Sequence, residues 1–198
     1  MHARRRTLFV TLLSAFLVAS AVAADPTSDT REVKVAELGL TLIPPPELIR
    51  NSAREAEVRR IVGAKAPTSA IFELDPELLK RDPKLPPRHF IVNGTRVDTK
   101  GMTPERQLRI SLLGADYFDT QTSDLKIAGI PAKRFQYQQS PLVGKPNPAV
   151  FDGGVKYYFC RPGLLLSVDF RIVVPKDQAE ALLKQCDAAV ATMKFEEP

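Results

Sequence analysis

The sequence predicts an α+β fold in which a mostly antiparallel sheet of about six strands is packed by two main helices. Two apolar-alternating segments, 155–161 and 164–173, flank Pro162-Gly163, which is the pattern of a β-hairpin. Apolar residues recur at helical spacing after Thr103 and again after Pro175. These observations predict both layers of the fold.

Residues 1–24 have the composition of a secretory signal peptide. Three arginines at positions 4–6 precede an apolar run over 8–18, and small residues follow up to Ala24. Cleavage fits after Ala23 or Ala24. The alternative is an uncleaved membrane anchor, because the uncharged stretch of 18 residues from position 7 to 24 is at the short limit for a membrane span.

Export determines the expected location and domain organisation. We expect a periplasmic or secreted protein with a flexible linker over 25–32 and a single α+β domain over 33–198. No stable membrane insertion is expected once the signal is cleaved. The 28 Lys+Arg of the chain fall to 25 without the three leader arginines, against 23 Asp+Glu. Basic residues are mixed with acids, as in Arg54–Glu57, so we expect no nucleic-acid partner.

The first part of the domain should form two strands and a helix. Val33–Ile43 alternates apolar residues and is predicted as one strand that ends at Pro44–Pro46. Ser52–Glu55 is a capping box, which predicts a helix ending at Val62. Ala70–Leu74 is predicted as the second strand.

The middle of the chain begins with a proline-rich connection over Pro76–Pro87. Asn93-Gly94 between Phe90–Val92 and Thr95–Val97 predicts a hairpin turn. The same Asn93-Gly94-Thr95 matches a glycosylation sequon, and the turn is the favoured interpretation.

Thr103 is predicted to cap the first main helix. We expect three of its apolar residues to point inward and two to lie near the edge of its apolar stripe. These are Leu108, Leu112 and Ala115 for the first group, and Ile110 and Leu113 for the second. Leu125–Gln138 should be extended, with a break at Gly129–Pro131.

The hairpin around Pro162-Gly163 has a register that the sequence predicts. A two-residue loop gives three apolar cross-strand pairs and one opposite-charge pair, each worth about 0.2–1 kcal/mol. These pairs are Phe159 with Leu166, Tyr157 with Val168, Val155 with Phe170, and Lys156 with Asp169. The last helix is predicted over Lys176–Ala191, followed by a short strand or an extended tail over Thr192–Phe195. Its expected buried residues are Leu182, Cys186, Ala189, Val190 and Met193.

Cys160 and Cys186 are the two cysteines of the chain, and an oxidising compartment favours a disulfide between them. The closed loop would contribute about 3 kcal/mol in the chain-entropy model. Two separate buried thiols are the alternative. The predicted register puts Cys160 on the Tyr158 face, so the last helix would have to cover that face for the bond to form.

The residue types needed for common catalysis are scarce. His89 is the one histidine after the leader, so two-histidine zinc patterns are excluded. A triad of His89 with Ser167 and Asp169 would lack a nucleophile-elbow sequence. We interpret Asp152–Gly154 as a turn before a strand, not a calcium loop. The sequence predicts no catalytic, cofactor-binding or metal-binding residue, and no cofactor.

Two groups of residues remain as functional candidates. Asp116 and Asp119 are three residues apart and could support acid–base chemistry, although solvation of a helix end also explains them. Tyr158 shares a strand face with Lys156 and is expected to be at least partly exposed. Together with Tyr137 and Tyr117, these two residues form the predicted binding surface.

Several segments match a known pattern: Leu38–Pro44, Ile127–Ala132, Tyr137, Tyr157–Phe159, Cys186-Asp187 and Thr192–Phe195. Their order resembles the PsbP-like fold, in the branch of exported bacterial proteins of the DcrB type. The resemblance spans most of the mature chain, and the Pro76–Pro87 insertion departs from it. It implies accessory subunits, adaptors or chaperone-like binders without shared catalytic residues.

The leading hypothesis is therefore an exported, non-catalytic binding or accessory protein of the cell envelope. Its partner would be a protein or an envelope component. The first alternative is an immunity or inhibitor protein that acts against a secreted enzyme. The second alternative is a carboxylate-dependent hydrolase that uses Asp116 and Asp119.

Overall fold

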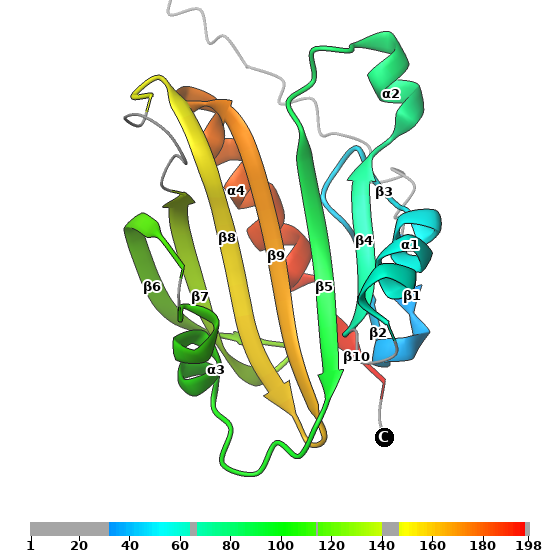
Figure 1. The fold of residues 1–198 in the computed structure, drawn as a ribbon, viewed down its shortest axis with the longest axis vertical. Helices are drawn as coiled ribbons and strands as arrows, with labels where there is room; N and C mark the ends of the chain where they lie inside the picture. The colour runs from blue at the N-terminus through cyan, green and yellow to red at the C-terminus, as the bar shows by residue number, and fades with distance from the viewer. Residues whose placement is uncertain (1–31, 64–66, 114, 140–146, 197–198) are drawn as a thin grey trace, which may run out of the picture. The chain divides into compact units, whose positions relative to one another are not determined.

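A computed structural model describes residues 32–63, 67–113, 115–139 and 147–196. The predicted leader, and the predicted linker apart from Glu32, lie outside these residues. The described part has the predicted α+β fold, with a seven-stranded sheet, a three-stranded sheet and four α-helices (Figure 1). None of its helices is long and apolar enough to cross a membrane.

The main sheet is antiparallel throughout and has the strand order β3-β4-β5-β9-β8-β7-β6. Its strands are β3 (Leu48–Arg50), β4 (Thr68–Leu74), β5 (Arg88–Arg96), β6 (Tyr117–Ile127), β7 (Ile130–Gln139), β8 (Val150–Arg161) and β9 (Leu164–Pro175). The helices are α1 (Ser52–Val62), α2 (Pro76–Arg81), α3 (Pro104–Ser111) and α4 (Lys176–Ala191).

The β8–β9 hairpin forms in the predicted register, and all four predicted cross-strand pairs are present. Pro162 and Gly163 make its two-residue loop, and Gly163 has a φ of 73°. A type II turn requires this positive φ after proline, and glycine adopts it without steric cost. The β6–β7 hairpin has a two-residue loop too, because Ile127 pairs with Ile130.

The predicted hairpin at Asn93-Gly94 is wrong, because β5 runs through both residues as one strand between β4 and β9. A Cβ on Gly94 would lie 2.3 Å from Leu38 Cδ2. The glycine therefore allows the segment around Leu38 to pack closely on the sheet, which is a second common use of glycine in strands.

The predicted single strand over Val33–Ile43 is interrupted. A short 3₁₀ helix (η1, Ala36–Leu38) and Gly39, with a φ of 59°, separate β1 (Val33–Val35) from β2 (Leu40–Leu42). The short final strand also forms, as β10 (Lys194–Phe195), and pairs with β2. The small sheet β1-β2-β10 therefore joins the beginning of the described chain to its end.

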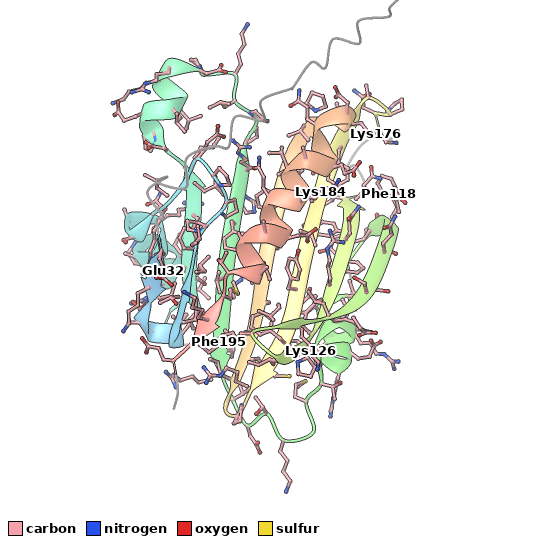
Figure 2. All side chains as sticks on the ribbon, turned by 180° about the vertical axis from the view of Figure 1, so that it is seen from behind. Glu32, Phe118, Lys126, Lys176, Lys184 and Phe195 are labelled. Carbon is pink, nitrogen blue, oxygen red and sulfur yellow. The ribbon has the colours of Figure 1, made fainter. Side chains whose placement is uncertain are left out.

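The main core lies between the sheet and α4, together with the small sheet (Figure 2). The five residues predicted to be buried in the last helix are all at most 8 % exposed. On the opposite face, α3 covers a second, smaller cluster that contains Leu108. Ala115 was expected to point inward, but it is exposed because α3 ends at Ser111.

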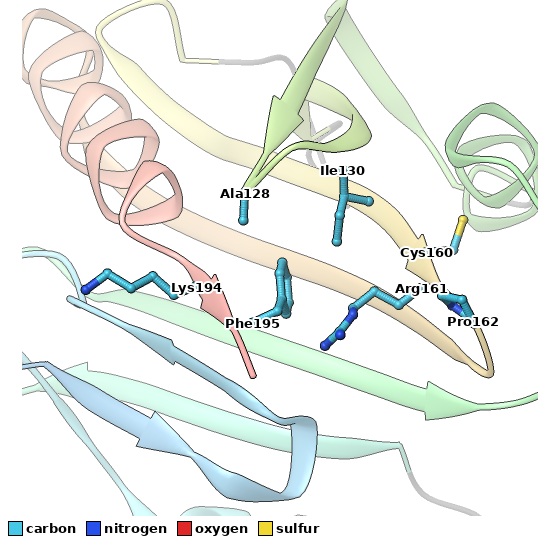
Figure 3. Close-up of a pocket in the computed structure, with 7 residues that line it drawn as sticks. All are labelled: Ala128, Ile130, Cys160, Arg161, Pro162, Lys194 and Phe195. Carbon is cyan, nitrogen blue, oxygen red and sulfur yellow. The ribbon is translucent and has the colours of Figure 1, made fainter. Parts of the chain in front are cut away.

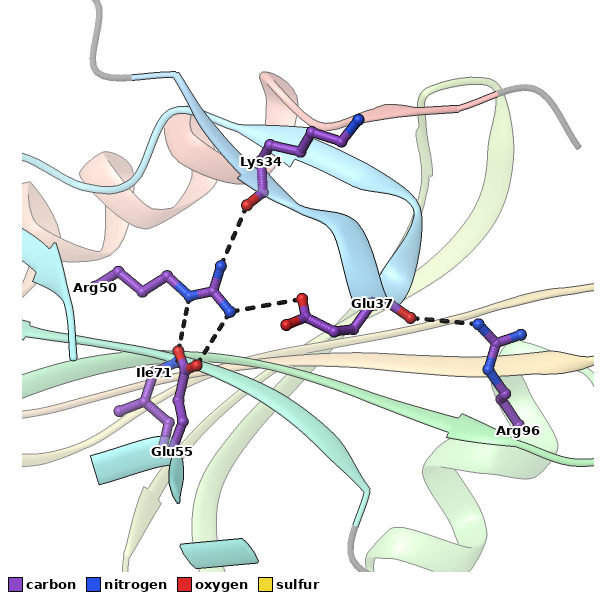
Figure 4. Close-up of polar contacts among 6 residues, drawn as sticks. All are labelled: Lys34, Glu37, Arg50, Glu55, Ile71 and Arg96. Atoms are coloured by element: carbon purple, nitrogen blue, oxygen red, sulfur yellow. Dashed lines mark hydrogen bonds and ion pairs between the residues drawn. The ribbon is translucent and has the colours of Figure 1, made fainter. Parts of the chain in front are cut away.

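An ion pair at the sheet edge connects four elements, β3, α1, β1 and β4 (Figure 4). Arg50 donates to both carboxylate oxygens of Glu55 in α1, at 2.9 and 3.0 Å, and to the Lys34 carbonyl in β1 at 3.2 Å. Glu55 also accepts the backbone N–H of Ile71 in β4, at 2.9 Å. Ile71 lies just beyond the last residue pair between β3 and β4. Asn51, one residue before the predicted cap, caps α1 by accepting the N–H of Arg54.

Candidate functional site

The structure brings the four predicted surface residues together beneath α3. Tyr117 comes from β6, Tyr137 from β7, and Lys156 and Tyr158 from β8. The ring centroids of Tyr117 and Tyr137 are 4.5 Å apart. The Lys156 ammonium lies 5.4 Å from the first centroid and 5.2 Å from the second, which is within the range of cation–π attraction.

Asp169 on β9 completes this polar network. Lys156 Nζ donates to the Tyr117 hydroxyl at 3.0 Å and lies 3.3 Å from Asp169 Oδ2. The Tyr137 hydroxyl donates to Asp169 Oδ1 at 3.4 Å. Burial alone would lower the pKa of Lys156, but Asp169 and Tyr117 outweigh it, so this pKa is raised above its ordinary value. Lys156 therefore stays charged and holds the network in place.

Two of these tyrosines are buried and do not form an exposed contact surface. Tyr137 is 2 % exposed and Tyr158 is 4 % exposed. With Leu108 and Phe135 they make the small core beneath α3. The expectation that Tyr158 is at least partly exposed is wrong, because Leu108 of α3 packs in the same cluster. The network therefore supports α3 from below.

A cavity of about 230 Å³ lies beside this network, between α3 and the strands β5, β8 and β9. Its lining includes Asn93, Gln107, Ile110 and Ser167. The Gln107 side-chain N–H donates to the Leu166 carbonyl at 3.0 Å. Among the described residues, its buried Oε1 atom has no hydrogen-bond partner. The cavity wall therefore includes a residue whose acceptor is unsatisfied, which is rare in native proteins.

Two large apolar side chains of the α3 segment are exposed, and one of them, Ile110, lines this cavity. Ile110 is 52 % exposed and Leu113 is 80 % exposed. We refer to Ile110, Leu113 and the cavity that contains Gln107 as the α3 patch. The sequence placed both apolar residues at the edge of the helix stripe. It gave no sign of Gln107, because a glutamine next to a buried leucine is ordinary in an amphipathic helix.

Charged residues continue the same sheet face away from α3. Arg171 donates to Asp152 at 3.1 Å, between neighbouring strands. His89 lies opposite Arg171 in the β5–β9 pairing. Burial lowers the pKa of His89, Asp169 raises it and Arg171 lowers it, and the net change is downward. His89 is therefore neutral at neutral pH.

The other chemical candidates are not assembled. Ser167 lies opposite Asn93, four residues along β5 from His89, so the considered triad does not form. Asp119 lies in β6 and accepts from Gln138. Neither Asp116 nor Asp119 lines the cavity beside α3. The described part of the chain contains no group of three or more His, Cys, Asp or Glu residues that could hold a metal ion.

The predicted disulfide is absent, because Cys160 and Cys186 are both free thiols. Cys186 belongs to α4 and lies in the main core. Cys160 shares the Tyr158 face, and its sulfur lies 3.6 Å from the Met102 carbonyl before α3. The register that the sequence predicted therefore holds, and it places the sheet between the two sulfurs. Burial raises the pKa of both thiols.

Two further cavities lie elsewhere. One of about 520 Å³ is lined by residues that include Ile130, Arg161 and Phe195 (Figure 3). Its Arg161 guanidinium stacks 4.8 Å from the Phe195 ring centroid and donates to the Glu196 carbonyl, so it has partners. The other cavity, of about 670 Å³, lies beneath α2.

Comparison with solved structures shows that the chain has the PsbP-like fold. The PsbP protein CyanoP of Synechocystis sp. PCC 6803 superposes with a TM-score of 0.51 at 12 % identity, over 87 % of this chain and 97 % of that one. A variant of the protein Mog1 gives the same score and identity, over 86 % and 97 %. LpqN, involved in cell envelope biogenesis of Mycobacterium tuberculosis, gives 0.49 at 12 % identity, over 84 % and 90 %. No family model and no curated protein matches the sequence.

Proposed function

We propose that this chain is an exported, non-catalytic binding protein of the cell envelope, and that a protein partner docks on the α3 patch. The signal-peptide pattern of residues 1–24 supports export. The PsbP-like fold is compatible with an accessory role, and the proposal itself rests on the patch.

The observation that carries the proposal is the pairing of apolar anchors with an unsatisfied polar atom. Leu113 and Ile110 are the kind of exposed large apolar residues that mark binding sites when they lie together. The cavity next to Ile110 has room for one partner side chain. A donor on that side chain would satisfy Gln107 Oε1. This hydrogen bond would orient the partner and would also add to the affinity.

The network beneath the patch keeps it ordered before a partner arrives. Leu108 packs on Tyr137 and Tyr158, and Lys156 ties the neighbouring strands together through Asp169. A partner would then bind without the entropy cost of ordering a loose surface.

Affinity capture from the native envelope fraction tests the proposal. Purified chain is immobilised as wild type, Ile110→Asp, Leu113→Asp and Ile61→Asp. Ile61 is the matched control, because it is an isoleucine 67 % exposed on α1. We expect wild type and Ile61→Asp to retain one saturable protein partner, and the two patch variants to bind it at least about tenfold more weakly.

Equal capture by all four proteins would refute the α3 patch as the docking surface. A captured secreted enzyme that loses activity on binding would instead support the inhibitor alternative raised by the sequence.

A further inference from the structure

The largest of the three cavities lies beneath α2 and is lined by both apolar and charged side chains. It occupies about 670 Å³, within the usual range for small-molecule sites. Leu74, Leu79 and Leu85 contribute apolar surface, and two arginines, Arg50 and Arg88, also line it. The cavity does not include any residue of the α3 patch.

The two arginines differ in what they bind. Arg50 is fully engaged in the fold, since its guanidinium contacts both oxygens of Glu55, the Lys34 carbonyl and the Glu37 carboxylate (Figure 4). Its role is to hold α1 and the small sheet on the main sheet.

Arg88 is more deeply buried and has fewer partners. The residue is 8 % exposed, and its one ion pair within the described chain is with Glu47, through Nη2. Its Nε atom is buried and has no hydrogen-bond partner among the described residues. A buried guanidinium N–H without an acceptor is costly, and such groups are rare in native proteins unless a ligand or water satisfies them.

Glu47 adds a second unusual feature at the same place. Its backbone has a φ of 69°, which is unfavourable for a residue with a side chain, and its N-terminal neighbours are three prolines. Asp75 fixes this backbone by donating its N–H to the Glu47 carbonyl at 3.0 Å. Backbone strain held in place by its surroundings is common at ligand sites.

From this geometry we propose that the cavity beneath α2 binds a small monocarboxylic acid with an apolar tail. The carboxylate would accept from Arg88 Nε, and the tail would pack against Leu79 and Leu85. The unsatisfied Arg88 Nε can bind one carboxylate. A second negative charge on the ligand would face Glu73 without another unpaired arginine, because Arg50 is already paired. This site is separate from the α3 patch, and its existence does not depend on the proposed partner.

Octanoate is a suitable probe, tested on the full chain by titration calorimetry with octan-1-ol as the uncharged analogue. We expect saturable octanoate binding with a Kd below about 1 mM, and octanol binding at least about tenfold weaker. His89 also lines the cavity, so its ring proton signals should shift with the same saturation curve.

Two variants test the assignment, each with a matched control. Arg88→Met removes the donor, and Arg81→Met removes an exposed arginine from the end of α2. Because Arg88→Met risks misfolding, Leu79→Glu places a negative charge at a wall residue that is already 38 % exposed, with Ile61→Glu as its control. Leu79→Glu and folded Arg88→Met should each weaken octanoate binding at least about tenfold, and the controls should bind normally.

Three results would overturn the inference. These are the absence of saturable octanoate binding at about 10 mM ligand, equal affinity for octanol, and unchanged binding by Leu79→Glu. Each leaves the α3 patch untouched, so failure of this proposal is distinguishable from failure of the proposed function.

Discussion

Lys156 and Asp169 lie opposite each other on β8 and β9, with 3.3 Å between the ammonium nitrogen and a carboxylate oxygen. Their side chains are 19 % and 29 % exposed. Through Tyr117 and Tyr137, the same two groups also reach β6 and β7. One partly buried ion pair therefore links four strands beneath the α3 patch.

Breaking this ion pair should destabilise the protein more than breaking a more exposed one. We expect Lys156→Met to lower the free energy of unfolding by about 1–3 kcal/mol, because Asp169 would remain partly buried without its counter-charge. Arg171→Met, whose pair with Asp152 is 39 % and 43 % exposed, should cost less than about 1 kcal/mol. Urea unfolding measures both variants, and similar costs would contradict the role given to Lys156.

Stability should fall steeply in alkaline solution. Burial is the largest cause of the raised pKa values of Tyr137, Tyr157 and Tyr158. Unfolded tyrosines ionise near pH 10, so above that pH the unfolded state has lost protons that the folded state keeps. The stability contributed by these groups is present below about pH 10 and is lost above it. Absorbance at 295 nm should show three of the four tyrosines ionising together with unfolding. Their ionisation in folded protein would refute this expectation.

Glu55 should contribute more to the free energy of unfolding than an exposed glutamate of the same helix. Glu55→Ala should cost about 3 kcal/mol, because it leaves Arg50 without its main partner and the Ile71 N–H without an acceptor. Glu57 is the matched control, since its pair with Arg54 is 51 % and 44 % exposed, and Glu57→Ala should cost less than about 1 kcal/mol. Thermal unfolding at equal concentration compares the two. Equal shifts in Tm would show that Glu55 is not a structural anchor.

Gly94 should tolerate a side chain only when Leu38 is made smaller. Gly94→Ala should destabilise the protein by about 1–3 kcal/mol, because the new methyl group collides with Leu38. The double variant Gly94→Ala/Leu38→Ala should cost less than the sum of the two single changes. A double-mutant cycle in urea provides the measurement. Strict additivity would mean that the contact between these residues is not what selects glycine.

The two cysteines should remain reduced even after purification under oxidising conditions. Because the sheet separates Cys160 from Cys186, Ellman titration of denatured, unreduced protein should find two thiols per chain. In native protein, Cys186 should not react, since it is 0 % exposed. A result of no free thiols in the denatured monomer would restore the disulfide that export favours.

Local signals explain which parts of the fold were predictable. The β8–β9 register follows from a short loop and alternation on both strands, so neighbouring residues carry all the necessary information. The hairpin prediction at Asn93-Gly94 was wrong because this dipeptide occurs in turns and also where a strand packs closely against another segment. The residue that distinguishes the two cases is Leu38, which is distant in sequence. The apolar alternation over Val33–Ile43 likewise did not reveal that Gly39, with a φ of 59°, lets β1 fold back and pair with β2.

The candidate site was predictable only in part. The cross-strand pattern correctly paired Lys156 with Asp169, and the structure places the predicted Tyr117 and Tyr137 in hydrogen-bond contact with these two groups. It could not show that α3 would bury Tyr158, because that depends on where a separate helix docks. Arg88 and Gln107 gave no signal, since an unpaired polar atom is a property of the packed structure.

The pairing of β2 with β10 determines when the small sheet can form during synthesis. The Gly39 carbonyl accepts a hydrogen bond from the Glu196 N–H, and the Ile43 N–H donates one to the Thr192 hydroxyl. Until the ribosome has added these two residues, the Gly39 carbonyl and the Ile43 N–H have only water to bind. The small sheet can close only after residues 192–196 have been synthesised, so removing these residues would leave β2 with an open edge.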